Sequence, residues 1–307
     1  MKRRRRLVKR RWIRVVMVLP VVVVVGVALW GYMDATGGVG AGTVWNYTWP
    51  GVDGGTRGGY LVGPAQALRS VSPDGDAIPA VRSGDGRVPA VLLLHHDMGL
   101  TVEIARLAER LAVEGYIVLA PDLFRGERAV SVPGALVLGW THRGADIAVD
   151  LELAFGQLAA LPEVDSRRVA VAGLAFGGTE AVRAGIRSNA PALIASISGK
   201  VPVVEGDDVV DEDRGGRGGQ DGGGQDGELG KLRQGRAFFG AFGRDDPGLR
   251  VDEVVRFGDR LRRYGGVVAI NIYDSVGLKG FTSGRPGANP DSRRVWRDFR
   301  QFLADNL

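Results

Sequence analysis

The stretch RVAVAGLAFGGTEAVRAGIRS, residues 168–188, decides the fold of this chain. Residues 168–174 are almost wholly apolar, which is typical of a strand buried on both faces. The glycine-rich segment GLAFGG, residues 173–178, predicts a tight turn, and residues 179–188 have the composition of a helix. A buried strand that turns sharply into a helix is the repeating unit of a parallel sheet covered by helices.

The same alternation extends along the chain in both directions. Apolar runs predict buried strands at 89–96, 116–122, 192–198, 236–243 and 267–273. Helical spacing of apolar residues predicts helices at 102–115, 143–161, 251–265 and 291–307. Residues 60–81 hold short apolar stretches broken by Pro and Gly, as in edge strands and turns. The pattern indicates an α/β fold, with a mostly parallel sheet and helices on both of its faces.

Composition limits the chemistry that this fold can carry. The chain has 307 residues, of which 45% are hydrophobic and 24% charged, so it can bury a sizeable core. It contains no cysteine, which excludes disulfides, thiolate catalysis and Cys-based metal sites. Its three histidines are His95, His96 and His142, too few to favour a His-rich metal site. We therefore expect neither a bound metal nor a cofactor.

Positive charge is concentrated at the N-terminus. Of the formal net charge of +5, residues 1–14 contribute +9 through nine Lys and Arg, and the remaining 293 residues carry −4. Nucleic-acid binding requires a basic face on the folded domain itself. The charge distribution therefore argues against nucleic acid as a partner.

Residues 15–33, VVMVLPVVVVVGVALWGYM, form an uncharged apolar stretch. As a helix these 19 residues would measure about 28 Å, close to the hydrocarbon thickness of a bilayer. The preceding basic residues predict a single-pass anchor with a cytoplasmic N-terminus and a globular domain on the exported, periplasmic or extracytoplasmic, side. A cleaved signal peptide is the main alternative, although only a poor cleavage site occurs, near Ala35.

Two further segments complete the expected organisation. Residues 34–58, rich in Gly, Thr and aromatic residues, are predicted to be a tether leading into a domain that spans 59–307. Residues 205–235 are rich in Gly, Asp and Gln and nearly lack apolar side chains. Because such a composition cannot offset the entropy lost on ordering, it predicts a low-complexity surface insertion that is disordered or loosely ordered.

The turn in the deciding stretch has the spacing of the nucleophile elbow G-x-S-x-G. Gly173 and Gly177 flank the central position, where a tight turn brings the helix close to the strand. The central residue is Ala175, whose methyl group cannot attack a substrate. Thr179 lies one helical turn further on, so its hydroxyl is not expected at the tip of the elbow.

Several segments together resemble the dienelactone hydrolase family of α/β-hydrolases, over roughly residues 88–307 apart from the insertion. HHDMGL, residues 95–100, resembles the family's H-E-x-x-G-L loop. LAVEGYIVLAPDL, residues 111–123, resembles its helix–Gly–strand–APDL run. Residues 243–247 resemble its acid loop and residues 273–281 its histidine loop. The resemblance implies the α/β-hydrolase fold.

The resemblance also implies that the catalytic triad is incomplete. The nucleophile position is occupied by Ala175. The acid position is best matched by Asp246, with Asp245 as the alternative. The histidine position falls at Lys279 if one residue is inserted, or at Leu278 if none is. A Ser/Cys–His–Asp mechanism requires nucleophile and base together, so the retained acid does not restore it.

The loop that follows residue 94 also departs from the family pattern. His96 replaces the acidic residue of the H-E-x-x-G-L loop. Backbone N–H groups near His96 and Phe176 depend on the turns alone, so an oxyanion-type pocket is expected to persist. His95 is expected to stabilise the loop by a hydrogen bond, and Asp97 beside it lacks the partners that support a metal site. His142 is expected to open a helix, away from the strand ends, and to serve as a surface or helix-end residue.

The sequence favours a membrane-anchored pseudoenzyme that serves as a structural, accessory or partner-binding subunit of a membrane complex. It would contact the lipid bilayer through residues 15–33 and a protein partner elsewhere. Two alternatives stay open. One is an active hydrolase of small esters or lactones that uses a non-standard catalytic set, with His95 or His96 and a bound water. The other is a sensor that binds a small carboxylate in the old cleft.

Overall fold

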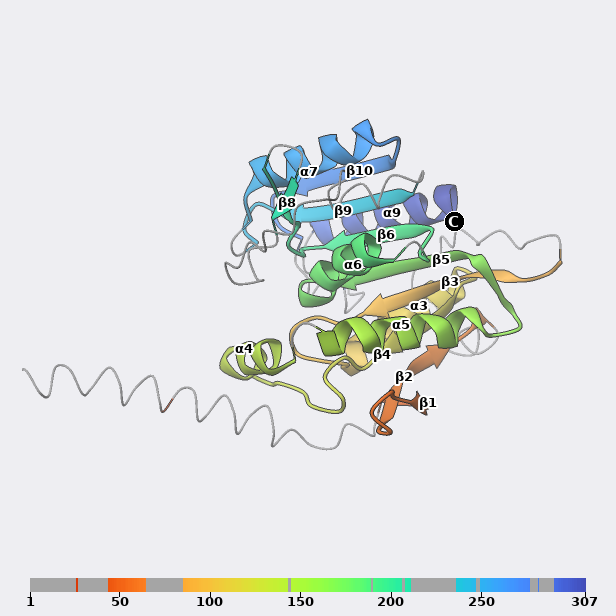
Figure 1. Cartoon of the computed structure of the whole chain (residues 1–307). Helices are drawn as coiled ribbons and strands as arrows, with labels where there is room; N and C mark the ends of the chain where they lie inside the picture. Colours follow the sequence, from red (N-terminus) through yellow and green to blue (C-terminus); the bar gives the residue numbers. More distant parts are fainter. Residues whose placement is uncertain are drawn as a thin grey trace, which may run out of the picture.

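The described part of the chain forms one mixed sheet covered by helices (Figure 1). The computed structural model describes residues 26, 44–64, 85–142, 145–188, 190–205, 208–210, 236–246, 249–276, 281 and 290–307. Within them, eight strands follow the order β1-β2-β4-β3-β5-β6-β9-β10. All neighbours from β4 to β10 run parallel, whereas β1 and β2 add an antiparallel edge beside β4. The predicted fold class, a mostly parallel sheet with helices on both faces, is confirmed.

The strands of this sheet are β1 (Tyr47–Pro50), β2 (Thr56–Val62), β3 (Val88–Leu94), β4 (Ile117–Pro121), β5 (Val164–Leu174), β6 (Leu193–Ile197), β9 (Ala237–Gly243) and β10 (Val267–Tyr273). The helices are α3 (Val102–Val113), α4 (Val132–Thr141), α5 (Ala145–Ala159), α6 (Phe176–Arg187), α7 (Val251–Arg263) and α9 (Pro290–Asn306). The buried strands and the helices expected from the apolar pattern are present with small shifts of their ends, and α4 is an additional helix that the sequence did not predict. Of the edge strands expected within 60–81, residues 60–62 belong to β2, and residues 65–81 lie outside the described part of the chain.

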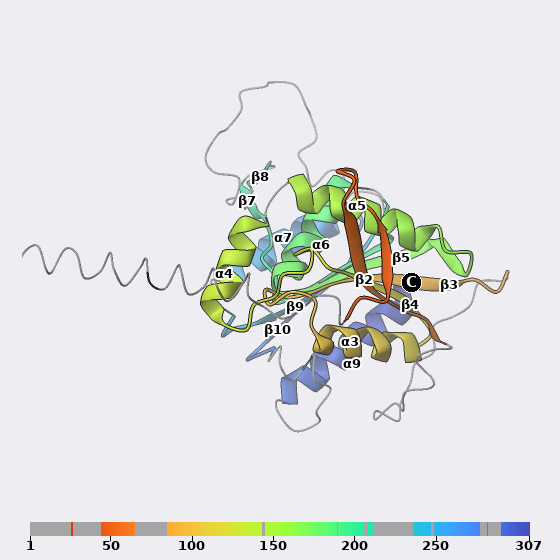
Figure 2. The same cartoon turned by 90° about the horizontal axis from the view of Figure 1, so that it is seen from below.

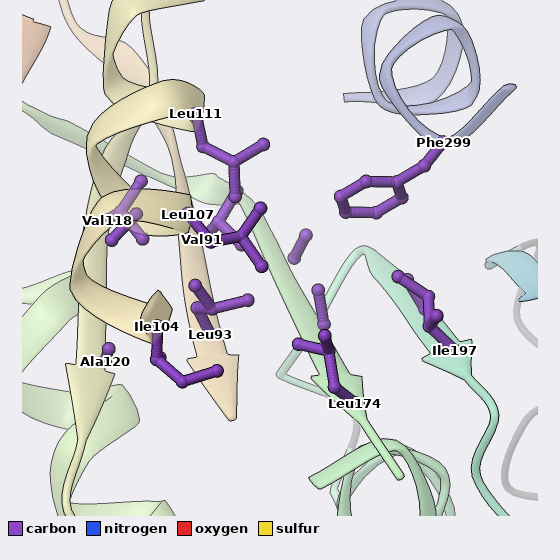
Figure 3. Packing of buried hydrophobic residues seen from close by; sticks show 14 of the residues in the cluster. Val91, Leu93, Ile104, Leu107, Leu111, Val118, Ala120, Leu174, Ile197 and Phe299 are labelled. Atoms are coloured by element: carbon purple, nitrogen blue, oxygen red, sulfur yellow. The ribbon is translucent and has the colours of Figure 1, made fainter. Parts of the chain in front are cut away.

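The helices divide between the two faces of the sheet. Figure 2 shows α3 and α9 on one side and α5, α6 and α7 on the other. Strand side chains point alternately to the two faces because the period of a strand is two residues. In β3, Val91 and Leu93 therefore pack with α3 and α9, as Figure 3 shows, while Leu92 packs with the helices of the opposite face. All seven residues of β3 are buried, so its apolar run reflects burial on both sides.

The expected tether is in part wrong. Residues 47–50 form β1, which pairs antiparallel with β2, and Trp49 is buried in the core. Val44 is also buried. The folded domain therefore includes residues 44–58, because the aromatic and Gly residues that suggested a linker form an edge hairpin.

The predicted insertion also begins differently. The short strands β7 (Val203–Glu205) and β8 (Asp208–Val210) pair as an antiparallel hairpin at its start. The Val residues at 203, 204, 209 and 210 give this hairpin the β-forming side chains that the rest of the segment lacks. Residues 211–235 lie outside the described part of the chain.

The predicted anchor cannot be compared with the structure. Among the residues described, none of the helices has the length and apolar character needed to cross a bilayer. Residues 15–33 fall outside them, apart from Gly26.

Asp122, directly after β4, ties the start of the domain to the sheet. Its carboxylate accepts hydrogen bonds from Trp45 Nε1 (2.9 Å) and from the amides of Phe124 and Gly126 (3.0 Å each). The side chain is almost fully buried, and this burial raises the pKa of Asp122 to about 6, against the opposing effect of the three donors.

We expect the contribution of Asp122 to stability to fall as pH rises. Its folded-state pKa of about 6 exceeds the ordinary value of 3.8, so between these values the folded chain holds a proton that the unfolded chain has released. The titration is absent in Asp122→Asn. Raising the pH from 4 to 7 should therefore stabilise Asp122→Asn relative to the wild-type protein, by up to about 3 kcal/mol in the free energy of unfolding.

Urea unfolding of both proteins at the two pH values measures this shift. Asp97→Asn, which removes an exposed carboxylate, is the control and should show no comparable shift. An equal difference between wild type and Asp122→Asn at both pH values would contradict the prediction.

Candidate functional site

Ala175 joins β5 to α6 in a backbone conformation that residues with a side chain rarely adopt. Its φ is 48° and its ψ is −110°. The Ala175 amide donates to the Ile197 carbonyl (2.8 Å), and the Ala175 carbonyl accepts from the Thr179 amide (3.0 Å). These bonds hold the turn between β6 and the first turn of α6. The elbow is built to present a side chain at the end of the sheet, and here it presents a methyl group.

The two flanking glycines are sterically required. A Cβ at Gly173 would overlap the Gly177 carbonyl, and a Cβ at Gly177 would overlap the carbonyl of His95 and lie 2.5 Å from the Leu94 oxygen. These neighbours are backbone atoms, which cannot move aside cheaply. The predicted role of Gly173 and Gly177 in a close strand–helix approach is confirmed.

His95 is a structural residue that stays neutral. Its Nδ1 lies 2.8 Å from the His96 carbonyl, and its Nε2 accepts a hydrogen bond from the Leu123 amide (3.1 Å). These two partners place the proton on Nδ1. The ring is completely buried, and burial lowers the pKa of His95 to about 3. With both nitrogens engaged, His95 holds two loops together, as expected, and can act neither as a base nor as a ligand.

An aromatic cluster lies beside the elbow. The Phe124 ring contacts the rings of His95 (4.7 Å between centroids), Phe176 (5.1 Å) and His142 (5.2 Å). His142 is a helix-end residue, as expected, but it caps the C-terminus of α4 instead of opening a helix. Its ring contacts Phe124, which lies in the loop that joins β4 to α4, and so lies near the strand ends. His142 Nε2 also lies 3.7 Å from Glu127.

Two backbone amides at the elbow are available to a ligand. Among the residues that the structure describes, none accepts a hydrogen bond from the Phe176 or the His96 amide. The Phe176 amide opens α6, where the helix dipole favours negative charge. The His96 side chain turns back on its own loop, since its Nδ1 accepts from the Met98 amide (3.1 Å). Burial lowers the pKa of His96, so the ring is neutral near pH 7.

Asp246, the better of the two candidates for the acid position, is half-buried after β9. Its Oδ2 accepts from the Gly243 amide (2.8 Å), whereas Asp245 is exposed. Burial raises the pKa of Asp246, against the lowering effects of the Gly243 amide and the Ser198 hydroxyl.

Ser198 was not singled out from the sequence. It follows β6 with a φ of 54°, its amide donates to the Ala241 carbonyl (2.8 Å), and its hydroxyl is buried. Ala175, Ser198 and Asp246 thus follow three neighbouring strands, β5, β6 and β9. The Ser198-Gly199 pair directly after an apolar run was the available signal, but only the sheet order places it between the elbow and the acid loop.

The remaining candidates are placed as follows. Thr179 Oγ1 donates to the Ala175 carbonyl (3.3 Å) and accepts from the Lys200 amide (2.9 Å), so it links the elbow to the segment that follows β6. Lys279 and Leu278 lie outside the described residues. Across the described part of the chain, no group of three or more acidic, His or Cys side chains is placed to hold a metal ion.

Comparison with known proteins agrees with this geometry. The sequence pattern of the dienelactone hydrolase family matches residues 76–199, which include the loop at His96 and the elbow. Over these residues the chain is similar to the dienelactone hydrolases. The family match ends before Asp246 and Lys279, so their assignment to triad positions still rests on the sequence resemblance.

A curated relative supports the same family. The chain is 29% identical over 106 residues to the Synechocystis protein named "Putative carboxymethylenebutenolidase", and the match covers 30% of this chain and 41% of that protein. The chain thus spans less than half the length of this relative.

Solved structures share the fold. A Klebsiella pneumoniae protein described as a "putative dienelactone hydrolase" superposes with a TM-score of 0.59 at 18% identity, over 84% of this chain and 96% of that one. A dienelactone-hydrolase-like promiscuous phosphotriesterase from metagenomic libraries gives a TM-score of 0.58 at 18% identity, over 85% and 97% of the two chains. Such low identities establish the α/β-hydrolase fold alone.

Gly177→Ala should destabilise this dienelactone-hydrolase-like domain by at least about 1–3 kcal/mol, since the new methyl group meets two backbone carbonyls. Gly156→Ala is the matched control. Gly156 lies inside α5 with open space around it, so alanine should stabilise the domain by about 0.5–1 kcal/mol. Urea unfolding distinguishes the two, and equal effects would disprove the close approach.

Ala175→Gly should raise the free energy of unfolding by about 1 kcal/mol. Glycine relieves the strain in the φ and ψ of the elbow, and this gain exceeds the extra chain entropy that glycine loses on folding. Ala184→Gly, in the regular part of α6, should instead lower stability by about 1 kcal/mol. A loss of stability in both variants would show that the elbow is unstrained.

Proposed function

We propose that this chain is a catalytically inactive dienelactone-hydrolase-like protein, held at a membrane by residues 15–33, that acts as an accessory or partner-binding subunit of a membrane complex. The observation that carries the proposal is Ala175 itself. The elbow keeps the strained backbone and both close-packed glycines that serve to expose a nucleophile, yet the exposed group is a methyl.

A base is as hard to supply as a nucleophile. His95 uses both ring nitrogens within the loop, and the Nδ1 of His96 accepts from the Met98 amide. The family's histidine position carries Lys279 or Leu278. A Ser–His–Asp reaction needs its members to act as a unit, so two independent losses remove it.

What the elbow retains is a binding geometry. The amides of Phe176 and His96 can donate to a carbonyl or carboxylate oxygen, beside the Phe176 ring, which packs on the buried Phe124. These two donors would hold a small carboxylate, or the C-terminus or acidic side chain of a partner, without turning it over.

The full chain in detergent should therefore not hydrolyse aryl esters or simple lactones above the buffer rate, and a fluorophosphonate probe should not label it. Ala175→Ser alone supplies a nucleophile without a base and should remain inactive. Ala175→Ser combined with Lys279→His should gain labelling and hydrolysis, at a rate on the order of 100-fold above that of Ala175→Ser. The Leu278→His version tests the other alignment of the histidine loop.

Hydrolysis by the wild-type chain is the second candidate function. It is supported by the enzyme names of the relatives and by the positions of Ser198 and Asp246, which follow β6 and β9, the two strands after β5 in the sheet order. In such a reaction the Asp246 carboxylate would take a proton from a water that attacks the acyl carbon, and would return it to the departing alkoxide. Wild-type turnover that is lost in Asp246→Asn, but kept in the exposed neighbour Asp245→Asn, would establish this function in place of the first.

The accessory role has its own test. Native membranes that contain the full chain, extracted in mild detergent and separated on a native gel, should show it in a larger complex at fixed stoichiometry. Migration as a monomer or homo-oligomer, together with ester turnover, would favour the hydrolase.

A further inference from the structure

Helix α4 is apolar on both of its faces, although it lies at the surface. No charged residue occurs among the 13 residues 129–141. The inner face contributes Ala135 and Leu138 to a buried cluster with Phe124 and Ala129, against which Phe176 packs. A short helix that is apolar all round is normally buried on every side, and α4 is not.

The outer face of α4 forms an exposed apolar stripe. Val132 is 67% exposed, Leu136 70% and Trp140 72%, and their spacing of four residues places them in one row along the helix. Val130, just before the helix, is 84% exposed. We call these four residues the α4 stripe. They make up half of the eight large apolar side chains that stand exposed on the described part of the chain.

The position of α4 makes the stripe a projecting surface. In both views α4 extends beyond the ends of the strands, on the side where β5 leads into the elbow (Figures 1 and 2). Contiguous exposed apolar side chains on a soluble face mark a contact with another molecule or with a membrane.

We propose that the α4 stripe rests in the interface of a lipid bilayer. The proposal rests on the membrane attachment described under the proposed function. Only ten residues, 34–43, separate the predicted span from Val44, the buried start of the domain. Fully extended, they reach about 36 Å, so the domain stays at the bilayer surface.

The chemistry of the stripe fits lipid better than a specific protein groove. Its members are aliphatic except for Trp140, at the end of the row, and the indole ring is favoured at the level of the lipid headgroups. The stripe carries no charge and no hydrogen-bonding side chain other than this indole, so nothing in it selects a partner sequence. Insertion of an apolar helix face of this kind scales with its apolar area.

The absence of cysteine from the chain allows a direct test. Leu136→Cys in the full chain, labelled with an environment-sensitive NBD fluorophore, is reconstituted into vesicles with 30% anionic lipid. Val255→Cys is the matched control, because Val255 is also an exposed aliphatic residue (46%) on a surface helix, α7. The label at 136 should be blue-shifted and quenched at least about twofold more strongly by nitroxide-bearing lipids than the label at 255.

Three other results would overturn the proposal. Equal quenching of both labels by aqueous iodide would place the stripe in water. The label at 136 could instead be protected from both iodide and lipid nitroxide. If this protection is lost when the protein is diluted in lipid, a second copy of the chain covers the stripe. The same protection without dependence on dilution would indicate contact within the chain itself.

Vesicle flotation in the same samples separates this proposal from the anchor. Flotation of both labelled proteins without lipid quenching at 136 would leave the anchor intact and refute the stripe alone. A failure of both proteins to float would refute the membrane attachment on which the two proposals depend.

Discussion

The near-contact between the start of α6 and the ends of the central strands is the constraint on which the site depends. Gly177 lies against the carbonyls at the end of β3, and Gly173 lies against Gly177, so any side chain at either position would push helix and sheet apart. This approach fixes the sharp turn at Ala175. It also sets the amides of Phe176 and His96 on two adjacent turns, whatever side chains those turns carry.

The geometry of a reaction site and the chemistry of a reaction are separable for this reason. Backbone packing maintains the elbow, and the strained φ of Ala175 persists because its neighbours over-determine it. Catalysis, by contrast, depends on a few side-chain atoms, each of which one substitution can remove. A site can thus keep its shape and amide donors after losing its nucleophile. Binding in such a site requires only the parts that packing preserves.

The strand ends also join the site to the surface of the domain. Phe124 contacts His95 and Phe176 on one side and His142 on the other, and α4 packs over this cluster. A surface held against a membrane by α4 would therefore lie one layer of side chains from the elbow. Membrane attachment and ligand binding would then share the same edge of the sheet.

The sequence alone determined the fold class, most strands and helices, and the presence of alanine at the centre of the elbow. It could do so because strands buried on two faces leave continuous apolar runs, and because the glycine spacing of the elbow reports a local steric requirement. It did not determine where His142 lies, that residues 44–58 join the sheet, or that Ser198 stands between Ala175 and Asp246. The last two facts follow from strand order and edge pairing, which bring together residues far apart in the chain, whereas the place of His142 depends on α4. The exposure of the α4 stripe was also decided by the tertiary structure, because an apolar segment has the same sequence pattern whether its outer face is buried or exposed.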